Sequence, residues 1–211
     1  MKLRFAVLCA LAFAAACRSG RPPAGAQEAP LSALTATTND DAMRELLARR
    51  AAFAGARSYM RVRATSNGKS QSFRAQLQVD ANGRMLLTAY TPVNTSAMRL
   101  YADGDRVTLY NDLERKKQEG SAAELAKTFG FFAPSLTPAE LALLIIGLPP
   151  SASAGKFVTT PAGMASASVD DVVITYDPPR FPPVHVVVER PGQKLEIEHL
   201  ELVASDAKVA P

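Results

Sequence analysis

The sequence predicts a mostly β fold of the α+β class, in which a curved antiparallel sheet is accompanied by a few helices. Apolar and polar residues alternate over consecutive stretches, which is the pattern of half-buried strands. Asn-Gly or Asp-Gly pairs at 67–68, 82–83 and 103–104 separate several of these stretches, and such pairs favour hairpin turns. The length and the apolar share of 47% suit one sizeable core.

Each expected strand has one apolar and one polar face. Every second residue between Phe73 and Val79 is apolar, so this strand buries one side and leaves the other in water. Short turns join neighbouring strands, which predicts a meander. The parity of the last strand changes after Ile197, which predicts a bulge near Glu198 and His199. The expected strands lie at 60–64, 73–80, 85–89, 98–100, 107–109, 172–176, 184–189 and 194–203.

Three segments carry helix signals. Residues 40–54 place apolar side chains on one face at helical spacing, and Gly55 follows as a stop. Capping boxes begin at Ser121 and Thr137. The second of these leads into Leu141 to Leu148, which is apolar nearly all round and therefore typical of a helix that is buried or covers an apolar surface.

The first sixteen residues have the composition of a secretory signal peptide. A charged start precedes the uncharged run 5–16, which is too short for a membrane span of about 20 residues. Ala14-Ala15-Ala16-Cys17 resembles the lipobox at which bacterial lipoproteins are cut and acylated on cysteine. We expect residues 1–16 to be removed and Cys17 to carry lipid. Ordinary cleavage after an Ala-x-Ala site, which releases a free periplasmic protein, is the alternative.

The remaining chain divides into a linker, one domain and a tail. Residues 17–38 are rich in Ala, Pro, Gly and Thr without an apolar period, so we expect a flexible linker. The folded domain is expected at 39–203, and a disordered tail at 204–211. Arg18 follows Cys17 where the inner-membrane retention signal of enteric bacteria has Asp. The expected location is therefore the outer membrane, with the domain lipid-anchored and facing the periplasm.

Signals for catalysis and for nucleic-acid binding are weak. His185 and His199 lie in different expected strands, and the sequence contains no Gly-rich phosphate loop, nucleophile elbow or His-x-x-x-His pair. Basic and acidic residues number 24 and 20 and are interspersed, which gives no electrostatic case for nucleic acid. We expect no enzymatic activity, no catalytic residue, no metal and no cofactor. The apolar sheet face then encloses either a solid core, which the patterning alone favours, or a lipid-sized cavity.

Several stretches resemble the LolB family of outer-membrane lipoprotein receptors. Residues 85–100 are similar to that family's strand, proline-containing protruding loop and strand, and residues 141–149 end in Gly-Leu-Pro as the family's helix does. Phe129-Gly130 with Pro134, and a 176–183 segment leading into two closing strands, also fit. The family has tryptophan where this chain has Leu144, and Leu-Gly where the loop has Val93-Asn94.

The resemblance implies an incomplete antiparallel β-barrel, a half-barrel of about ten strands, with about three helices packed at its mouth. It implies a monomeric, membrane-anchored receptor that accepts lipoproteins from a LolA-like periplasmic carrier and inserts them into the outer membrane. The membrane-delivery loop would be Pro92, Val93 and Asn94. Acyl chains would bind in a cavity lined by Phe73, Leu77, Leu87, Leu100, Leu141, Leu144 and Ile145. Two other classes stay open: a non-catalytic envelope assembly or interaction module, and a lipid or lipopolysaccharide carrier.

Replacing Cys17 with Ala tests the anchor. The native chain should fractionate with membranes and carry lipid, and the Cys17→Ala chain should move to the soluble fraction, since acyl chains hold it only through that cysteine. Fractionation with mass spectrometry of the N-terminus measures both. A native chain that is already soluble and unlipidated would show that the lipobox resemblance is misleading.

Overall fold

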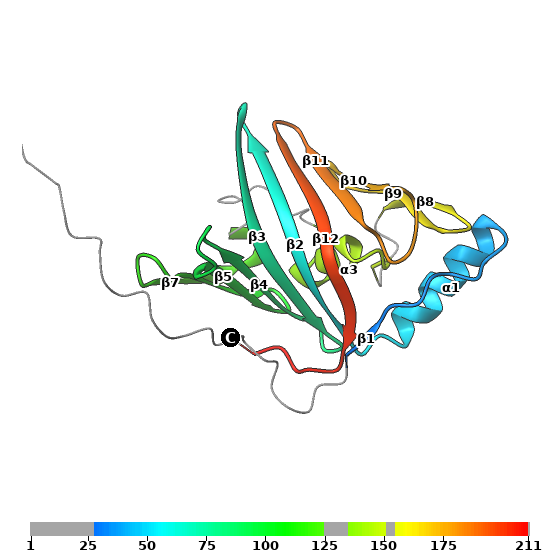
Figure 1. The fold of residues 1–211 in the computed structure, drawn as a ribbon, viewed down its shortest axis with the longest axis horizontal. Helices are drawn as coiled ribbons and strands as arrows, with labels where there is room; N and C mark the ends of the chain where they lie inside the picture. Colours follow the sequence, from blue (N-terminus) through cyan, green and yellow to red (C-terminus); the bar gives the residue numbers. More distant parts are fainter. Residues whose placement is uncertain (1–27, 125–134, 151–154, 211) are drawn as a thin grey trace, which may run out of the picture.

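The computed structural model describes residues 28–124, 135–150 and 155–210, and its main feature is one twisted antiparallel sheet of twelve strands (Figure 1). The order across the sheet is β7-β6-β5-β4-β3-β2-β12-β11-β10-β9-β8, with β1 beside β12. The strands are β1 (Glu28–Pro30), β2 (Gly55–Ser66), β3 (Lys69–Asp80), β4 (Arg84–Tyr90), β5 (Ser96–Asp103), β6 (Arg106–Asn111), β7 (Lys116–Ser121), β8 (Lys156–Thr160), β9 (Gly163–Val169), β10 (Val172–Asp177), β11 (His185–Arg190) and β12 (Gln193–Ser205).

The sheet is curved but not closed, because β7 and β8 end the path without pairing with each other. The expected half-barrel is therefore confirmed, with twelve strands rather than about ten. The antiparallel register brings the β2–β3, β4–β5, β6–β7, β9–β10 and β11–β12 connections to the same ends of the strands. We call this side of the sheet the loop rim.

The concave face is a continuous apolar surface. Cross-strand pairing places Leu77 beside Leu87, Leu87 beside Leu100, and Leu100 beside Leu109, so one row of leucines crosses β3 to β6. Ile197, Val186 and Tyr176 extend the same face across β12, β11 and β10. The bulge in β12 falls between His199 and Glu201, beside the expected position, and it explains the change of parity.

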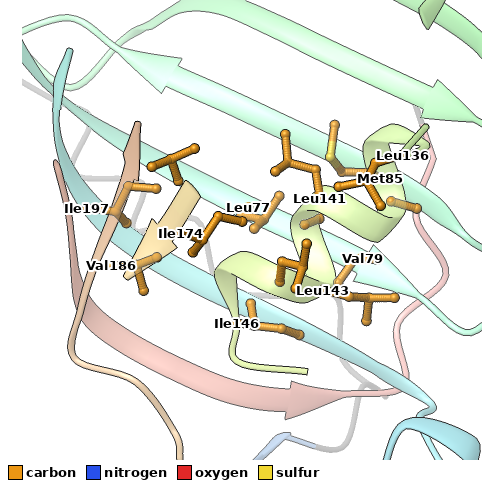
Figure 2. Close-up of a cluster of buried hydrophobic side chains, with 14 of the residues drawn as sticks. Leu77, Val79, Met85, Leu136, Leu141, Leu143, Ile146, Ile174, Val186 and Ile197 are labelled. Atoms are coloured by element: carbon orange, nitrogen blue, oxygen red, sulfur yellow. The ribbon is translucent and has the colours of Figure 1, made fainter. Parts of the chain in front are cut away.

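Helix α3 (Pro138–Ile145) lies in the hollow of the sheet and fills part of it (Figures 1 and 2). Thr137 and Glu140 form the predicted capping box, and Pro138 occupies the first turn, where its missing N–H costs nothing. Figure 2 shows Leu141 beside Met85, and Leu143 beside Val79. The helix ends at Ile145, before the expected Leu148. Gly147 follows the cap residue Ile146, with a φ of +87° that suits glycine and no room for a Cβ beside Pro183.

Helix α1 (Asn39–Ala51) packs against β8 and β9 at the end of the sheet (Figure 1). Thr38 caps its first turn by accepting from the backbone N–H of Asp41. The helix stops three residues before the expected end, and Gly55 begins β2 instead. A further helical turn begins at Ala122–Glu124, at the predicted capping box in which Ser121 and Glu124 exchange hydrogen bonds. No helix among the described residues has the length and hydropathy to span a bilayer.

Both ends of the domain extend further than the sequence predicts. Strand β1 lies in the expected linker and pairs with the end of β12, where the Glu28 carboxylate accepts from Arg57 at 2.6 Å. The expected disordered tail contributes the last residues of β12, and Val209 is only 2% exposed. The backbone N–H of Val209 donates to the buried carboxylate of Asp80, which supplies a polar reason for the tail to fold back. The signal peptide and Cys17 lie outside the described residues.

Shortening a side chain of α3 tests how much this helix contributes to stability. Leu144 is fully buried, so Leu144→Ala should lower the free energy of unfolding by about 2–5 kcal/mol. Leu47→Ala on the exposed face of α1, where the side chain is 48% exposed, should change it by less than about 0.5 kcal/mol. Urea denaturation measures both variants. Equal effects would mean that α3 is not an integral part of the core.

Candidate functional site

The seven side chains expected to line a cavity all lie in or against one apolar cluster in the hollow of the sheet. Leu77, Leu100, Leu141 and Leu144 are buried within it. These four therefore belong to a packed core between α3 and the strands, which is the arrangement that the solid-core alternative requires. A separate pocket of about 270 Å³ lies between the end of α1, the β3–β4 turn and the start of α3. None of the seven side chains lines this pocket.

The other three, Phe73, Leu87 and Ile145, are only half-buried. On the strands, Phe73 and Leu87 are joined by half-buried Met98 and Leu195, and all four point to the concave face. The register places Phe73, Met98 and Leu195 nearer the loop rim than the buried Leu77, Leu100 and Ile197. We call Phe73, Leu87, Met98, Ile145 and Leu195 the apolar strip. Each of its members keeps some accessible surface that an apolar ligand could cover.

The C-terminal end of α3 is held to the sheet by two side-chain hydrogen bonds. The hydroxyl of Tyr176 on β10 donates to the carbonyl of Leu144 at 2.7 Å, and Nε2 of His199 on β12 lies 3.1 Å from the carbonyl of Ile145. Carbonyls in the last turn of a helix have no partner within the helix, and leaving them buried without a donor is costly. His199 supplies a donor for the carbonyl of Ile145, and Tyr176 adds a second donor to the carbonyl of Leu144, which also accepts from the backbone N–H of Gly147 at 2.9 Å.

Burial lowers the pKa of His199 to about 4, so the imidazole is neutral near pH 7. A carbonyl oxygen only accepts, so Nε2 carries the hydrogen and donates it to Ile145. Nδ1 is then an acceptor, and the hydroxyl of Ser58 on β2, at 2.7 Å, donates to it. Ser58 is 1% exposed, so this chain of hydrogen bonds links β2, β12 and α3 in the interior. It is a positioning arrangement with no exposed nucleophile or base.

The β4–β5 loop, which contains Pro92, Val93 and Asn94, is held in one shape at the loop rim. The backbone N–H of Thr91 donates to the carbonyl of Thr95 at 2.8 Å, and that of Asn94 donates to the carbonyl of Thr91 at 2.9 Å. Asn94 has a φ of +63°, which asparagine tolerates. Val93 is 80% exposed at the tip, so the loop presents an apolar side chain to solvent.

Sequence reasoning missed the role of His199 and Tyr176. The sequence places both residues in expected strands, and the structure confirms this. These contacts join residues that are far apart in the sequence. No local sequence pattern shows that β10 and β12 both place a polar group against the end of α3. A polar residue at an inward-facing position of a strand, as Tyr176 and His199 are, is the clue that could have indicated a buried partner.

The fold is similar to that of solved structures of low sequence identity. A domain assigned to outer membrane lipoprotein sorting in Vibrio parahaemolyticus is 10% identical, with a TM-score of 0.52 over 82% of this chain and 95% of that one. A protein of the DUF1329 family from Desulfovibrio piger is 12% identical, with a TM-score of 0.50 over 82% and 96%. A LolA-superfamily protein from Nitrosomonas europaea is 9% identical, with a TM-score of 0.48 over 83% and 96%. No protein-family model and no curated protein sequence matches this chain.

These likenesses define the class of fold. The chain has an open half-barrel with a helix in its hollow, a fold that it shares with the domain from Vibrio parahaemolyticus. At such low identity the likeness supports that fold without singling out LolB.

The buried histidine gives stability a defined pH dependence. His199 has an ordinary pKa of 6.5 and a folded-state pKa of about 4, so between these values the unfolded chain binds more protons than the folded one. Its neutral form contributes fully above pH 6.5, and up to about 3 kcal/mol is lost as the pH falls toward 4. His199→Gln keeps an N–H for the Ile145 carbonyl but does not titrate.

The difference between native and His199→Gln unfolding free energies should therefore shrink as pH falls from 6.5 to 4. Chemical denaturation at half-unit pH steps measures it. A difference that stays constant over this range would mean that His199 is not held neutral in the folded protein.

Proposed function

We propose that this protein is a membrane-anchored, acyl-chain-binding receptor that accepts lipoproteins from a LolA-like periplasmic carrier and helps to insert them into the outer membrane. The apolar strip on the concave face carries the proposal. It offers partly exposed apolar side chains in a hollow, next to a packed helix and near the rim that holds an exposed apolar loop tip. The likeness to lipoprotein-sorting domains supports it.

Transfer of this kind is a matter of burial and requires no catalytic group. An acyl chain in water costs about 0.8 kcal/mol for each exposed CH₂, so a carrier must cover it. A receptor needs only a somewhat better apolar surface than the donor, together with a route into the bilayer. The polar groups in the hollow that hold α3, Ser58, Tyr176 and His199, are committed to internal hydrogen bonds. We therefore assign the protein a carrier role and no enzymatic activity.

In this proposal the anchor and the loop have separate tasks. Lipid on Cys17 holds the protein at the inner leaflet of the outer membrane, facing the periplasm. The Pro92-Val93-Asn94 tip touches the bilayer and helps cargo to leave. One valine is worth at most about 1.5–3 kcal/mol on full burial, so it cannot replace the anchor.

A second candidate function is an envelope interaction module without a ligand. The burial of Leu77, Leu100, Leu141 and Leu144 favours it, because these four side chains already pack against one another as a core would. The two candidates differ in one measurable property, which is whether the hollow takes up an acyl chain.

Titration of a fluorescent fatty acid against residues 18–211 separates them, since all described strands and helices lie within this range. Saturable binding is expected. Leu87→Gln, on the concave face, should weaken it about tenfold if roughly 1.4 kcal/mol of apolar contact is lost. Leu86→Gln is the matched control, because Leu86 is also half-buried but points to the other face of the same strand. Absence of binding, or equal effects of the two substitutions, would favour the interaction module.

The delivery loop is tested separately. Val93→Glu should leave folding and fatty-acid binding nearly unchanged, since the side chain is exposed, but it should slow transfer of bound cargo into liposomes. Val93→Leu should preserve or increase the transfer rate, because it enlarges the apolar tip. Transfer by the Val93→Glu variant at the native rate would reduce the loop to a hairpin connection.

A further inference from the structure

A second exposed apolar tip lies beside Val93. Leu113, in the β6–β7 turn, is 68% exposed, which makes it the next most exposed large apolar side chain among the described residues. Sequence patterning did not single it out, because it is one leucine within the polar stretch Asn111 to Glu119. A single exposed leucine on a protein surface needs no functional explanation. Leu113 differs because it lies on the loop rim next to the loop that carries Val93.

The two tips belong to neighbouring, mutually bonded loops. Strand β5 follows the Val93 loop and pairs with β6, which precedes the Leu113 turn. The carboxylate of Asp112 accepts from the hydroxyl of Ser96 and from the guanidinium of Arg99, the latter at 3.0 and 3.1 Å. The backbone N–H of Asp112 also donates to the carbonyl of Ala97 at 3.0 Å. The base of one loop is thus fixed to the base of the other.

The other strand-to-strand turns that the structure describes on the loop rim have no such tip. The β2–β3 turn is Asn67-Gly68, the β9–β10 turn is Asp170-Asp171, and the β11–β12 turn is Pro191-Gly192. Exposed apolar side chains on this rim are therefore concentrated in the two adjacent loops. They lie on the side of the molecule toward which the apolar strip extends.

Basic and aromatic side chains lie close in sequence to the second tip. Glu114 follows Leu113, and the three basic residues Arg115, Lys116 and Lys117 come next. Lys116 and Lys117 pair with Glu114 and Glu119, whereas Arg115 is exposed and forms no ion pair within the described part of the chain. The ring of Tyr110 lies 4.7 Å from the guanidinium carbon of Arg99 and 5.7 Å from Nζ of Lys117. Exposed leucine next to arginine, lysine and tyrosine is the composition of a membrane-interface segment.

We propose that Leu113 and Val93 together form a two-point contact with the surface of an anionic bilayer, with Arg115 facing the lipid phosphates. The contact deepens the proposed function, because it turns the apolar strip toward the membrane that receives the cargo. Two separate protruding tips suit a bilayer, which accepts side chains anywhere on its surface, better than a protein partner, which needs a continuous complementary area. Two fixed points also orient the domain, which one valine and a flexible anchor cannot do.

Vesicle sedimentation of residues 18–211, without the lipid anchor, tests this contact. The protein should bind vesicles of phosphatidylethanolamine and phosphatidylglycerol more tightly than vesicles of phosphatidylcholine. Leu113→Glu should weaken binding about tenfold, and Leu113→Phe should retain it. Leu47→Glu is the matched control, because Leu47 is also an exposed leucine but lies on α1. It should bind as the native chain does.

Native-like vesicle binding by Leu113→Glu, an equal loss in Leu47→Glu, or no vesicle binding by the native sequence would overturn the inference. Fatty-acid titration of the same proteins without vesicles separates this result from failure of the proposed function. If fatty acid does not bind but Leu113→Glu still loses vesicle binding, the receptor function fails and the membrane contact stands.

Discussion

The structure depends on the burial of one nearly all-apolar helix, α3, inside a curved sheet. Such a helix is stable in water only if its sides are covered by apolar strands and its terminal backbone groups find partners. The capping box of Thr137 and Glu140 satisfies the first turn, and Tyr176 and His199 satisfy carbonyls of the last. The open half-barrel, the neutral histidine and the positive φ of Gly147 all follow from the need to place this helix in the hollow and end it there.

Filling the hollow only in part gives the sheet two different regions. Near the β3–β4 turn the leucines of α3 and the strands form an ordinary core, and toward the loop rim the apolar strip retains accessible surface. The same rim carries Val93 and Leu113. The apolar strip therefore extends toward the same side of the molecule as the two exposed tips. This arrangement suits the proposed carrier role, in which cargo moves by relative burial.

The sequence predicts the central strands well because each has one wet and one dry face. It predicts both capping boxes, Ser121 with Glu124 and Thr137 with Glu140, because their signals are local. It fails for β7, whose residues Lys116 to Ser121 are almost all polar, since an edge strand needs no apolar face and benefits from lysine. Strand β1 and the buried Val209 were missed because their partners, β12 and Asp80, are distant in sequence. The depth to which each lining residue is buried depends on where α3 lies, which no local pattern reveals.

The central claim is that acyl chains occupy the concave face beside α3. Photo-cross-linking with a diazirine-labelled fatty acid, followed by mass spectrometry of the labelled peptides, tests it most directly. Labelling should concentrate on peptides that contain Phe73, Leu87, Met98 or Ile145, and unlabelled fatty acid should suppress it. Labelling spread over the outer face of the sheet, or labelling that excess fatty acid does not reduce, would contradict the claim and leave α3 as the filling of a solid core.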